Sequence, residues 1–182
     1  MTVPIILGVI AVVAVLLVFM YNGMVKARNN VDNGWSQIDV QLHRRYDLIP
    51  NLVETVKGYA AHESQTFEAV TQARNAAMNA KTTVEQAQAD NMMTSALKSL
   101  FAVSEAYPEL KANENFLQLQ EELTATEGRI AYARQFFNDA VLRYNTKIQS
   151  FPAMLVASPF GFKARDFFEA DDVTRGPTKV QF

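Results

Sequence analysis

The sequence predicts an all-α protein, an antiparallel four-helix bundle that is continuous with an N-terminal transmembrane helix. Two observations point to this class: the chain opens with an uncharged apolar run, and apolar residues behind it recur at steps of three and four as far as residue 149. Proline and capping residues divide this second part into four helical stretches. The predicted domains are a transmembrane anchor (1–22), a bundle (23–150) and a C-terminal tail rich in proline and phenylalanine (151–182) that packs near the membrane end of the bundle.

The composition excludes several classes of function. The 182 residues carry a formal net charge of −2 and no cysteine, so we expect neither nucleic-acid binding nor disulfide or thiol chemistry. The two histidines, His43 and His62, leave little material for a His-rich metal site. We expect no cofactor.

The anchor consists of residues 3–20, VPIILGVIAVVAVLLVFM, which contain no charged and no strongly polar side chain. As a helix that rises about 1.5 Å per residue they span about 27 Å, close to the thickness of the hydrocarbon core of a bilayer. A cleaved signal peptide would need basic residues before the run and a small-x-small cleavage site after it. No Lys or Arg precedes the run, and FMYNGM is a poor cleavage site. Lys26 and Arg28 follow the run, so the positive-inside rule predicts a cytoplasmic bundle and an N-terminus outside.

The first bundle helix is predicted to continue the anchor without a break, over about residues 5–46. Its apolar stripe consists of Met24, Val31, Trp35, Ile38 and Leu42. Pro50 suits the first turn of a new helix and disfavours helical geometry at the residue before it. The stretch DLIP (47–50) is therefore predicted to be a corner, with Arg44 and Arg45 at the C-terminal end of the first helix, where the dipole favours positive charge.

Three further helices follow, joined by short corners that make neighbours antiparallel. The second starts at Pro50 and has an apolar stripe made of Val53, Val56, Ala60, Phe67, Val70 and Ala77. The third starts at TTVE, where Thr82 and Glu85 form a capping box, and it ends before Pro108. The fourth starts at Asn113, a suitable cap, and has the most regular stripe of the chain: Phe116, Leu119, Leu123, Thr126, Ile130, Ala133, Phe137, Ala140 and Tyr144.

The tail, SFPAMLVASPFGFKARDFFEADD, has two prolines, a glycine and five phenylalanines, and it cannot form a regular helix. The fourth helix returns toward the membrane in this arrangement, so the tail would start near the lipid surface. The candidate membrane-surface residues are Phe160, Phe162, Lys163, Arg165, Phe167 and Phe168. The alternative is that these apolar residues pack against the open end of the bundle. We favour packing, because anionic lipid would repel Asp166, Glu169, Asp171 and Asp172.

No motif for catalysis is present in the sequence. A carboxylate-bridged metal pair in a bundle needs Glu-x-x-His on two helices, but Val40 and Tyr59 occupy the positions three residues before the two histidines. Zinc-protease, nucleophile-elbow and phosphate-loop motifs are also missing. We therefore predict no catalytic residue and no metal ligand.

Polar residues nevertheless fall on the inner stripes. Glu63 and Arg74 lie on the stripe of the second helix and Arg28 on that of the first, and a buried charge needs a partner. We predict that the indole N–H of Trp35, or an arginine of a neighbouring helix, satisfies Glu63. Glu63, Trp35, Arg74 and Arg28 form the candidate interior polar cluster, which we interpret as a core pair that sets the helix register rather than as a functional site.

Long strings of the chain resemble one known family. VDNGWSQIDVQLHRRYDLIPNLVETVKGYAAHE, NFLQLQEELTATEGRIAYARQFFNDAVLRYN and FPAMLVA are similar to the bacterial LemA family, and the tail FGFKARDFFEA fits as well. The resemblance implies a single-pass protein of the bacterial inner membrane with a four-helix bundle. It supplies no established activity and no catalytic motif.

The function expected is that of a membrane-tethered module that binds other membrane or cytoplasmic proteins, with no catalytic activity. Gly23 and Ala27 form a small-x-x-x-small pair, which is compatible with a homo-oligomer. Two alternatives stay open: an enzyme or sensor with a small-ligand or metal site between helices, and a membrane-surface protein that binds lipid.

Overall fold

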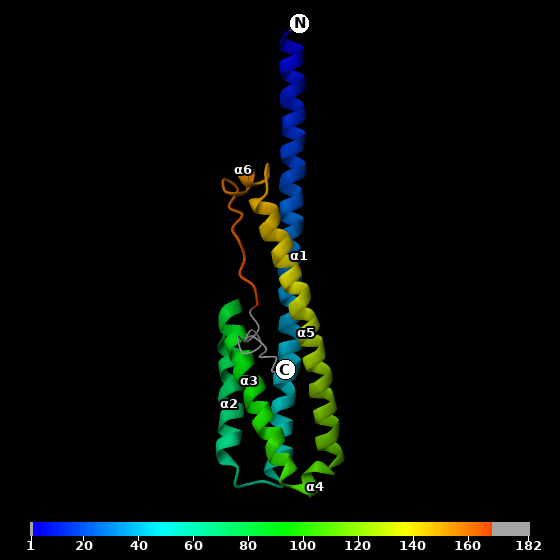
Figure 1. Ribbon diagram of the computed structural model, residues 1–182, viewed down its shortest axis with the longest axis vertical. Helices are drawn as coiled ribbons and strands as arrows, with labels where there is room; N and C mark the ends of the chain where they lie inside the picture. The colour runs from blue at the N-terminus through cyan, green and yellow to red at the C-terminus, as the bar shows by residue number, and fades with distance from the viewer. Residues whose placement is uncertain (1, 169–182) are drawn as a thin grey trace, which may run out of the picture. The chain divides into compact units, whose positions relative to one another are not determined.

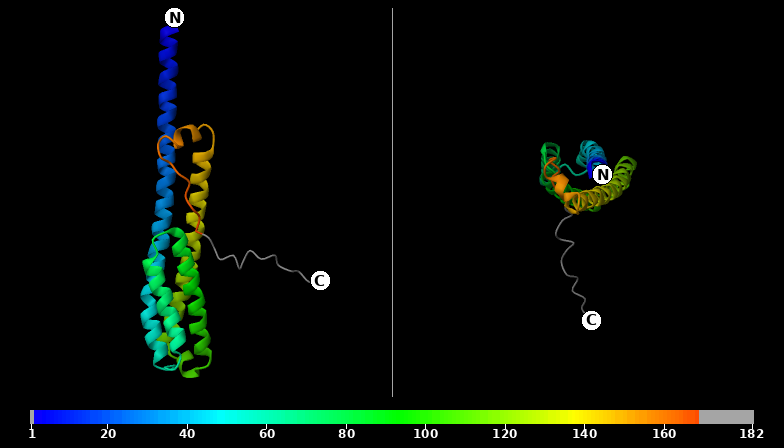
Figure 2. Two further views of the ribbon diagram at one scale, coloured as in Figure 1. Left: turned by 90° about the vertical axis from the view of Figure 1, so that its left-hand side faces the viewer. Right: turned by 90° about the horizontal axis from the view of Figure 1, so that it is seen from above.

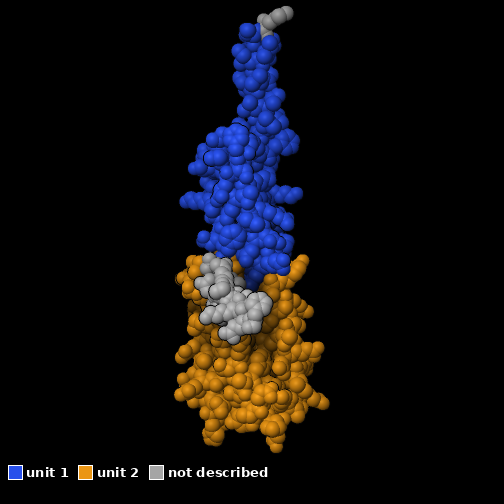
Figure 3. All heavy atoms as spheres, in the orientation of Figure 1, with its two compact units in different colours: residues 1–38, 133–167 blue, residues 39–132, 168–182 orange. Residues whose placement is uncertain are grey.

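The computed structural model describes residues 2–168, which form helices and no strand (Figure 1). The predicted all-α class is confirmed. The helices are α1 (Thr2–Lys57), α2 (Ser64–Asn79), α3 (Thr83–Glu105), α4 (Pro108–Lys111), α5 (Glu114–Gln149) and α6 (Met154–Ala157). The chain divides into two compact units, which Figure 3 colours separately: unit 1 (Met1–Ile38 and Ala133–Phe167) and unit 2 (Asp39–Tyr132 and Phe168–Phe182). Helices α1 and α5 contribute to both units.

Unit 1 consists of the first part of α1, the last part of α5, α6 and the segment after it. The two long helices are antiparallel, because a Cβ on Gly23 would lie 2.7 Å from the ammonium nitrogen of Lys147 and one on Gly34 would lie 3.1 Å from Cα of Phe137. Their buried seam is made of Met24, Val31, Ile38, Phe137, Ala140, Val141, Tyr144 and Ile148. N-terminal to this seam, no residue of the apolar run of α1 is buried, and residues 3–19 are exposed.

Unit 2 packs the end of α1, α2, α3 and the start of α5 side by side (Figure 2). Its core residues are buried from all four segments and include Leu42, Ile49, Leu52, Val56, Phe67, Val70, Met93, Leu100, Phe116, Leu123 and Ile130. Because each segment presents an apolar stripe at helical spacing, the four stripes can share one core.

The helix starts predicted from caps are confirmed for α3 and α5. The backbone N–H of Glu85 donates to Thr82 Oγ1 at 3.1 Å, and the Glu85 carboxylate accepts from the N–H of Thr82 at 3.1 Å. The N–H of Lys81 also donates to this carboxylate, and the bonds from Lys81 and Thr82 lower the pKa of Glu85. At the start of α5, Asn113 Oδ1 accepts from the N–H of Phe116 at 3.0 Å.

The corner predicted at DLIP is wrong. α1 runs through Pro50 to Lys57, and the turn lies at residues 58–63, so that the second helix begins at Ser64. Proline inside a helix leaves the carbonyl four residues earlier without its usual amide donor. That carbonyl belongs to Tyr46, and Arg74 Nε of α2 donates to it at 3.0 Å (both within unit 2). A side chain from another helix therefore replaces the donor that Pro50 lacks.

Candidate functional site

The centre of unit 2 contains a buried arginine that joins three helices. Arg45 of α1 is fully buried; its Nη1 lies 2.5 Å from Oδ1 of Asp90 on α3, and its Nε lies 2.9 Å from Oε1 of Glu127 on α5. Nη2 donates to Oγ1 of Thr94 at 3.0 Å. Burial lowers the pKa of Arg45, and the charge of Glu127 opposes that shift. Arg45 therefore links α1 to both α3 and α5.

Sequence reasoning missed this network. The sequence predicts Arg45 at a helix end, and this prediction is wrong, because α1 continues for another twelve residues, to Lys57. A signal was present: Asp90 falls on the same stripe as Met93, Leu97 and Leu100, all buried. An acidic residue on an apolar stripe of one helix and a basic residue on that of another indicate a buried pair.

Tyr46, next to Arg45, accepts hydrogen bonds at its side-chain hydroxyl and at its backbone carbonyl. Its hydroxyl accepts a hydrogen bond from Gln86 Nε2 at 2.8 Å, and its carbonyl accepts the bond from Arg74. Tyr46 is 2% exposed, so these bonds are made in the interior, where polar groups need partners. Both polar groups of Tyr46 are thus bonded within unit 2.

The predicted interior polar cluster is distributed over both units. Arg28 and Trp35 belong to unit 1, where the guanidinium of Arg28 lies 5.4 Å from the ring centre of Phe162, and Trp35 lies 5.7 Å from the ring centre of Phe137. Glu63 and Arg74 belong to unit 2. Glu63 is half-buried at the N-cap position of α2, whereas Arg74 binds the carbonyl described above. The pairing predicted for Glu63 stays a prediction.

The predicted membrane-surface residues have different surroundings. Phe162 is buried and its ring lies 5.6 Å from that of Tyr21, whereas Phe160 is 62% exposed and lies 5.3 Å from the same ring. Lys163, Arg165 and Phe167 are exposed, and Phe168, which belongs to unit 2, is buried. Glu169, Asp171 and Asp172, on which the argument for packing partly rested, lie outside the described residues.

Hydrogen bonds between side chains of α5 and backbone groups hold the segment that carries Lys163 and Arg165. The hydroxyl of Tyr144 donates to the carbonyl of Lys163 at 2.9 Å, and the side chain of Asn145 bonds both the N–H and the carbonyl of Arg165, at 2.9 and 2.8 Å. The guanidinium of Arg165 also pairs with Asp32 at 3.0 Å.

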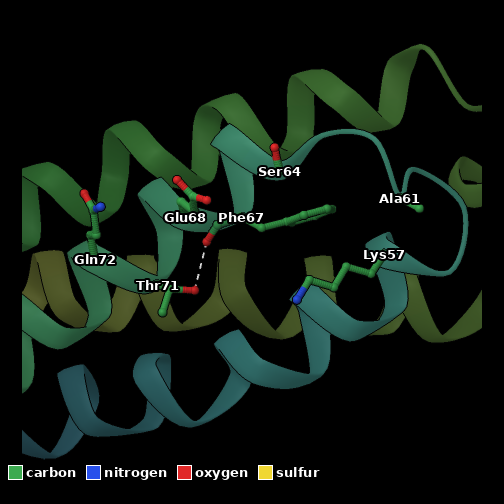
Figure 4. A pocket seen from close by; sticks show the side chains of 7 residues that line it. All are labelled: Lys57, Ala61, Ser64, Phe67, Glu68, Thr71 and Gln72. Atoms are coloured by element: carbon green, nitrogen blue, oxygen red, sulfur yellow. Dashed lines mark hydrogen bonds between the residues drawn. The ribbon is translucent and has the colours of Figure 1, made fainter.

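An open groove of about 440 Å³ lies in unit 2, where the end of α1 faces the start of α2 (Figure 4). It is lined by Lys57, Ala61, Ser64, Phe67, Glu68, Thr71 and Gln72. The ammonium of Lys57 lies 5.5 Å from the ring centre of Phe67, and Thr71 Oγ1 donates to the Phe67 carbonyl at 2.8 Å. Ala61 and Phe67 supply the apolar part of the lining, and Lys57 and Glu68 add charges of both signs.

Among residues 2–168, no three His, Cys, Asp or Glu side chains are grouped so that they could hold a metal ion. Arg45, Asp90 and Gln86 bond side chains of other helices, whereas Ser104 and Thr126 donate to carbonyls of their own helix. The described residues thus define a class: an all-α protein with one helix, near its N-terminus, that is long and apolar enough to cross a membrane.

The chain belongs to the LemA family, whose model matches residues 34–182. It is 27% identical to the magnetosome protein MamQ 2 of Paramagnetospirillum magneticum, over 90% of this chain and 70% of that protein. It is also 27% identical to the protein LemA of Metamycoplasma hominis, over 85% of this chain and 71% of that protein. The magnetosome protein MamQ of Magnetospirillum gryphiswaldense is 26% identical over 90% of this chain and 69% of its own length.

Proposed function

We propose that this protein is a single-pass protein of the bacterial inner membrane, whose helical units lie in the cytoplasm and bind other proteins without catalysing a reaction. The observation that carries the proposal is the continuity of α1, in which an exposed apolar run leads without a break into packed helices. Confinement of such a module to the membrane plane raises its local concentration near membrane partners, so that weak contacts suffice.

The basic residues around the end of the apolar run support the orientation. Lys26 and Arg28 follow it on α1, and Lys147 of α5 lies against Gly23 in the same unit. Basic residues near the end of a span favour the cytoplasmic side.

The groove of unit 2 is the proposed protein contact site. It is open, so an extended segment or a helix of a partner can reach Glu68, Thr71 and Gln72 on one side of α2. The bond from Arg74 to the carbonyl of Tyr46 joins α2 to α1, the two helices that line the groove. A rigid support lowers the entropy lost when a partner binds.

Crosslinking in native membranes tests the partner. A photoreactive amino acid at Gln72, on the rim of the groove, is expected to capture a reproducible neighbouring protein, identified by mass spectrometry. The control is the same amino acid at Arg129, an exposed residue of α5 that does not line the groove. Equal capture from the two positions, or none from Gln72, would reject the groove as the contact site.

Cysteine labelling tests the orientation, because the chain contains no natural cysteine. In intact cells, a membrane-impermeant maleimide is expected to label Thr2→Cys and to label Lys98→Cys only after lysis. The reverse pattern would contradict the cytoplasmic placement.

A further inference from the structure

We propose that residues 150–162 form a second membrane contact, an apolar cap that lies in the headgroup region of the bilayer crossed by α1 and prefers anionic phospholipid. This inference goes beyond protein binding, and it rests on the anchoring part of the proposed function. The observations that carry it all lie within unit 1.

The cap is an ordered segment with an inner and an outer side. After α5 ends, the N–H of Met154 donates to the carbonyl of Ser150 at 2.9 Å, and the N–H of Phe162 donates to the carbonyl of Ala157 at 3.0 Å. Gly161 has a φ of 74°, a backbone conformation that favours glycine, and the chain reverses there. Val156, Ala157 and Phe162 are buried on the inner side.

The outer side exposes large apolar side chains. Phe151 is 78% exposed, Met154 51%, Leu155 63% and Phe160 62%. Four such side chains within ten residues form a concentrated apolar surface, and a surface of this kind in water marks a site of interaction. Because its backbone is bonded internally and its inner side is packed, the cap cannot hide these residues by a small change of rotamer.

The position of the cap identifies what covers this surface. Tyr21 directly follows the apolar run, and its ring contacts Phe160 at 5.3 Å and Phe162 at 5.6 Å. In Figure 1 the cap, which includes α6, lies beside α1 at the C-terminal end of the exposed apolar run. A bilayer that covers residues 3–20 therefore ends at the level of the cap. Tyrosine and other aromatic side chains are enriched at this level of a membrane protein.

The charge of unit 1 matches an anionic surface. The chain as a whole has a net charge of −2, yet unit 1 contains seven Lys and Arg side chains and three Asp side chains. Lys147 lies against α1 at Gly23, two residues beyond Tyr21, and Lys163 directly follows the buried Phe162. Basic side chains next to inserted apolar residues are the combination that binds anionic bilayers.

The test uses the full chain reconstituted into vesicles of phosphatidylglycerol and phosphatidylcholine. Single cysteines at Leu155 (L155C), at Val13 within the anchor (V13C) and at Gln37 of unit 1 (Q37C), each an exposed position, carry an environment-sensitive fluorophore. Lipids with a nitroxide near the headgroup or near the acyl end report the depth of each label. Iodide reports exposure to water.

We expect the Leu155 label to emit at shorter wavelength than the Gln37 label and to resist quenching by iodide. The nitroxide near the headgroup should quench the Leu155 label most, and the nitroxide near the acyl end should quench the Val13 label most. Replacing Lys163 by Gln is expected to lower the ratio of inserted to free cap about fivefold in the anionic vesicles. Vesicles of phosphatidylcholine alone are expected to weaken insertion and to remove the effect of Lys163.

If iodide quenches the Leu155 label as readily as the Gln37 label, while the Val13 label reports the bilayer interior, the cap does not contact the membrane and the anchor is unaffected. A Val13 label in water would overturn the anchor and the cap together. Insertion that is equally strong in both kinds of vesicle would overturn the preference for anionic lipid.

Discussion

Replacing Arg74 by methionine should destabilise unit 2 through a carbonyl on another helix. The carbonyl of Tyr46 faces Pro50 in the helical repeat, and proline has no N–H to donate. Arg74 Nε donates to this carbonyl at 3.0 Å, and Tyr46 is 2% exposed. Methionine retains the apolar stem of the side chain and removes the donor.

The expected loss is about 1–3 kcal/mol of unfolding free energy, the range for removing one partner of a buried polar group. The loss should depend on Pro50. In a Pro50→Ala background, residue 50 regains an N–H that can donate to Tyr46, so the same Arg74→Met change should cost much less. Pro50 is exposed, and the Ala substitution therefore removes little packing. We expect a coupling energy of about 1–2 kcal/mol between the two positions.

The assay is denaturant unfolding of the full chain in non-ionic detergent, followed by circular dichroism at the helical band, for the wild type, both single variants and the double variant. Equal dependence on denaturant in all four proteins makes the free energies comparable. If Arg74→Met costs the same in both backgrounds, within about 0.5 kcal/mol, the bond to Tyr46 does not compensate for the proline and the explanation for the uninterrupted helix fails.

Other predictions concern the buried pair, the helix cap and two glycines. Asp90→Leu should cost about 3–5 kcal/mol of unfolding free energy, because it leaves the buried Arg45 without one carboxylate, and Arg45→Met in the same chain should recover much of that loss; the denaturation assay above measures both. The pKa of Glu85 is lowered from its ordinary value of 4.5, so its capping bonds stabilise the fold above pH 4.5 and are lost as the pH falls through the folded pKa. In acid titrations followed by circular dichroism, Glu85→Gln should therefore lose less stability than the wild type. Gly34→Ala should lower the melting temperature, at a cost of about 1–3 kcal/mol, because the new Cβ would meet the α5 backbone at 3.1 Å. Gly128→Ala should instead gain about 0.5–1 kcal/mol in the same melts, because no atom lies within 4 Å of the new Cβ.

The parts of the fold that depend on local chemistry were predictable from the sequence. Thr82 and Glu85 form both bonds of a capping box within four residues, and Asn113 caps α5 within three. The apolar stripes likewise predicted the all-α class, because the spacing of three and four is a property of each helix alone. These features need no knowledge of which helices are neighbours.

The features that sequence reasoning missed depend on partners far along the chain. The donor that lets α1 continue through Pro50 lies 28 residues from the carbonyl that needs it, and the first carboxylate of Arg45 lies 45 residues away. A proline is a strong local signal for a corner, so a local reading places the corner there. Gly58, directly after the true end of α1, was the better signal for the helix end.

The internal bonds of unit 2 also limit where function can lie. A ligand that entered the interior would have to separate Arg45 from Asp90 or Tyr46 from Gln86, and breaking one buried charge pair alone costs about 3–5 kcal/mol. A partner that binds the groove beside Phe67, or a lipid surface that covers Phe151 and its neighbours, meets side chains that are already accessible and breaks no such bond. Because the framework is stabilised from within, binding at either of these two surfaces breaks none of its buried bonds.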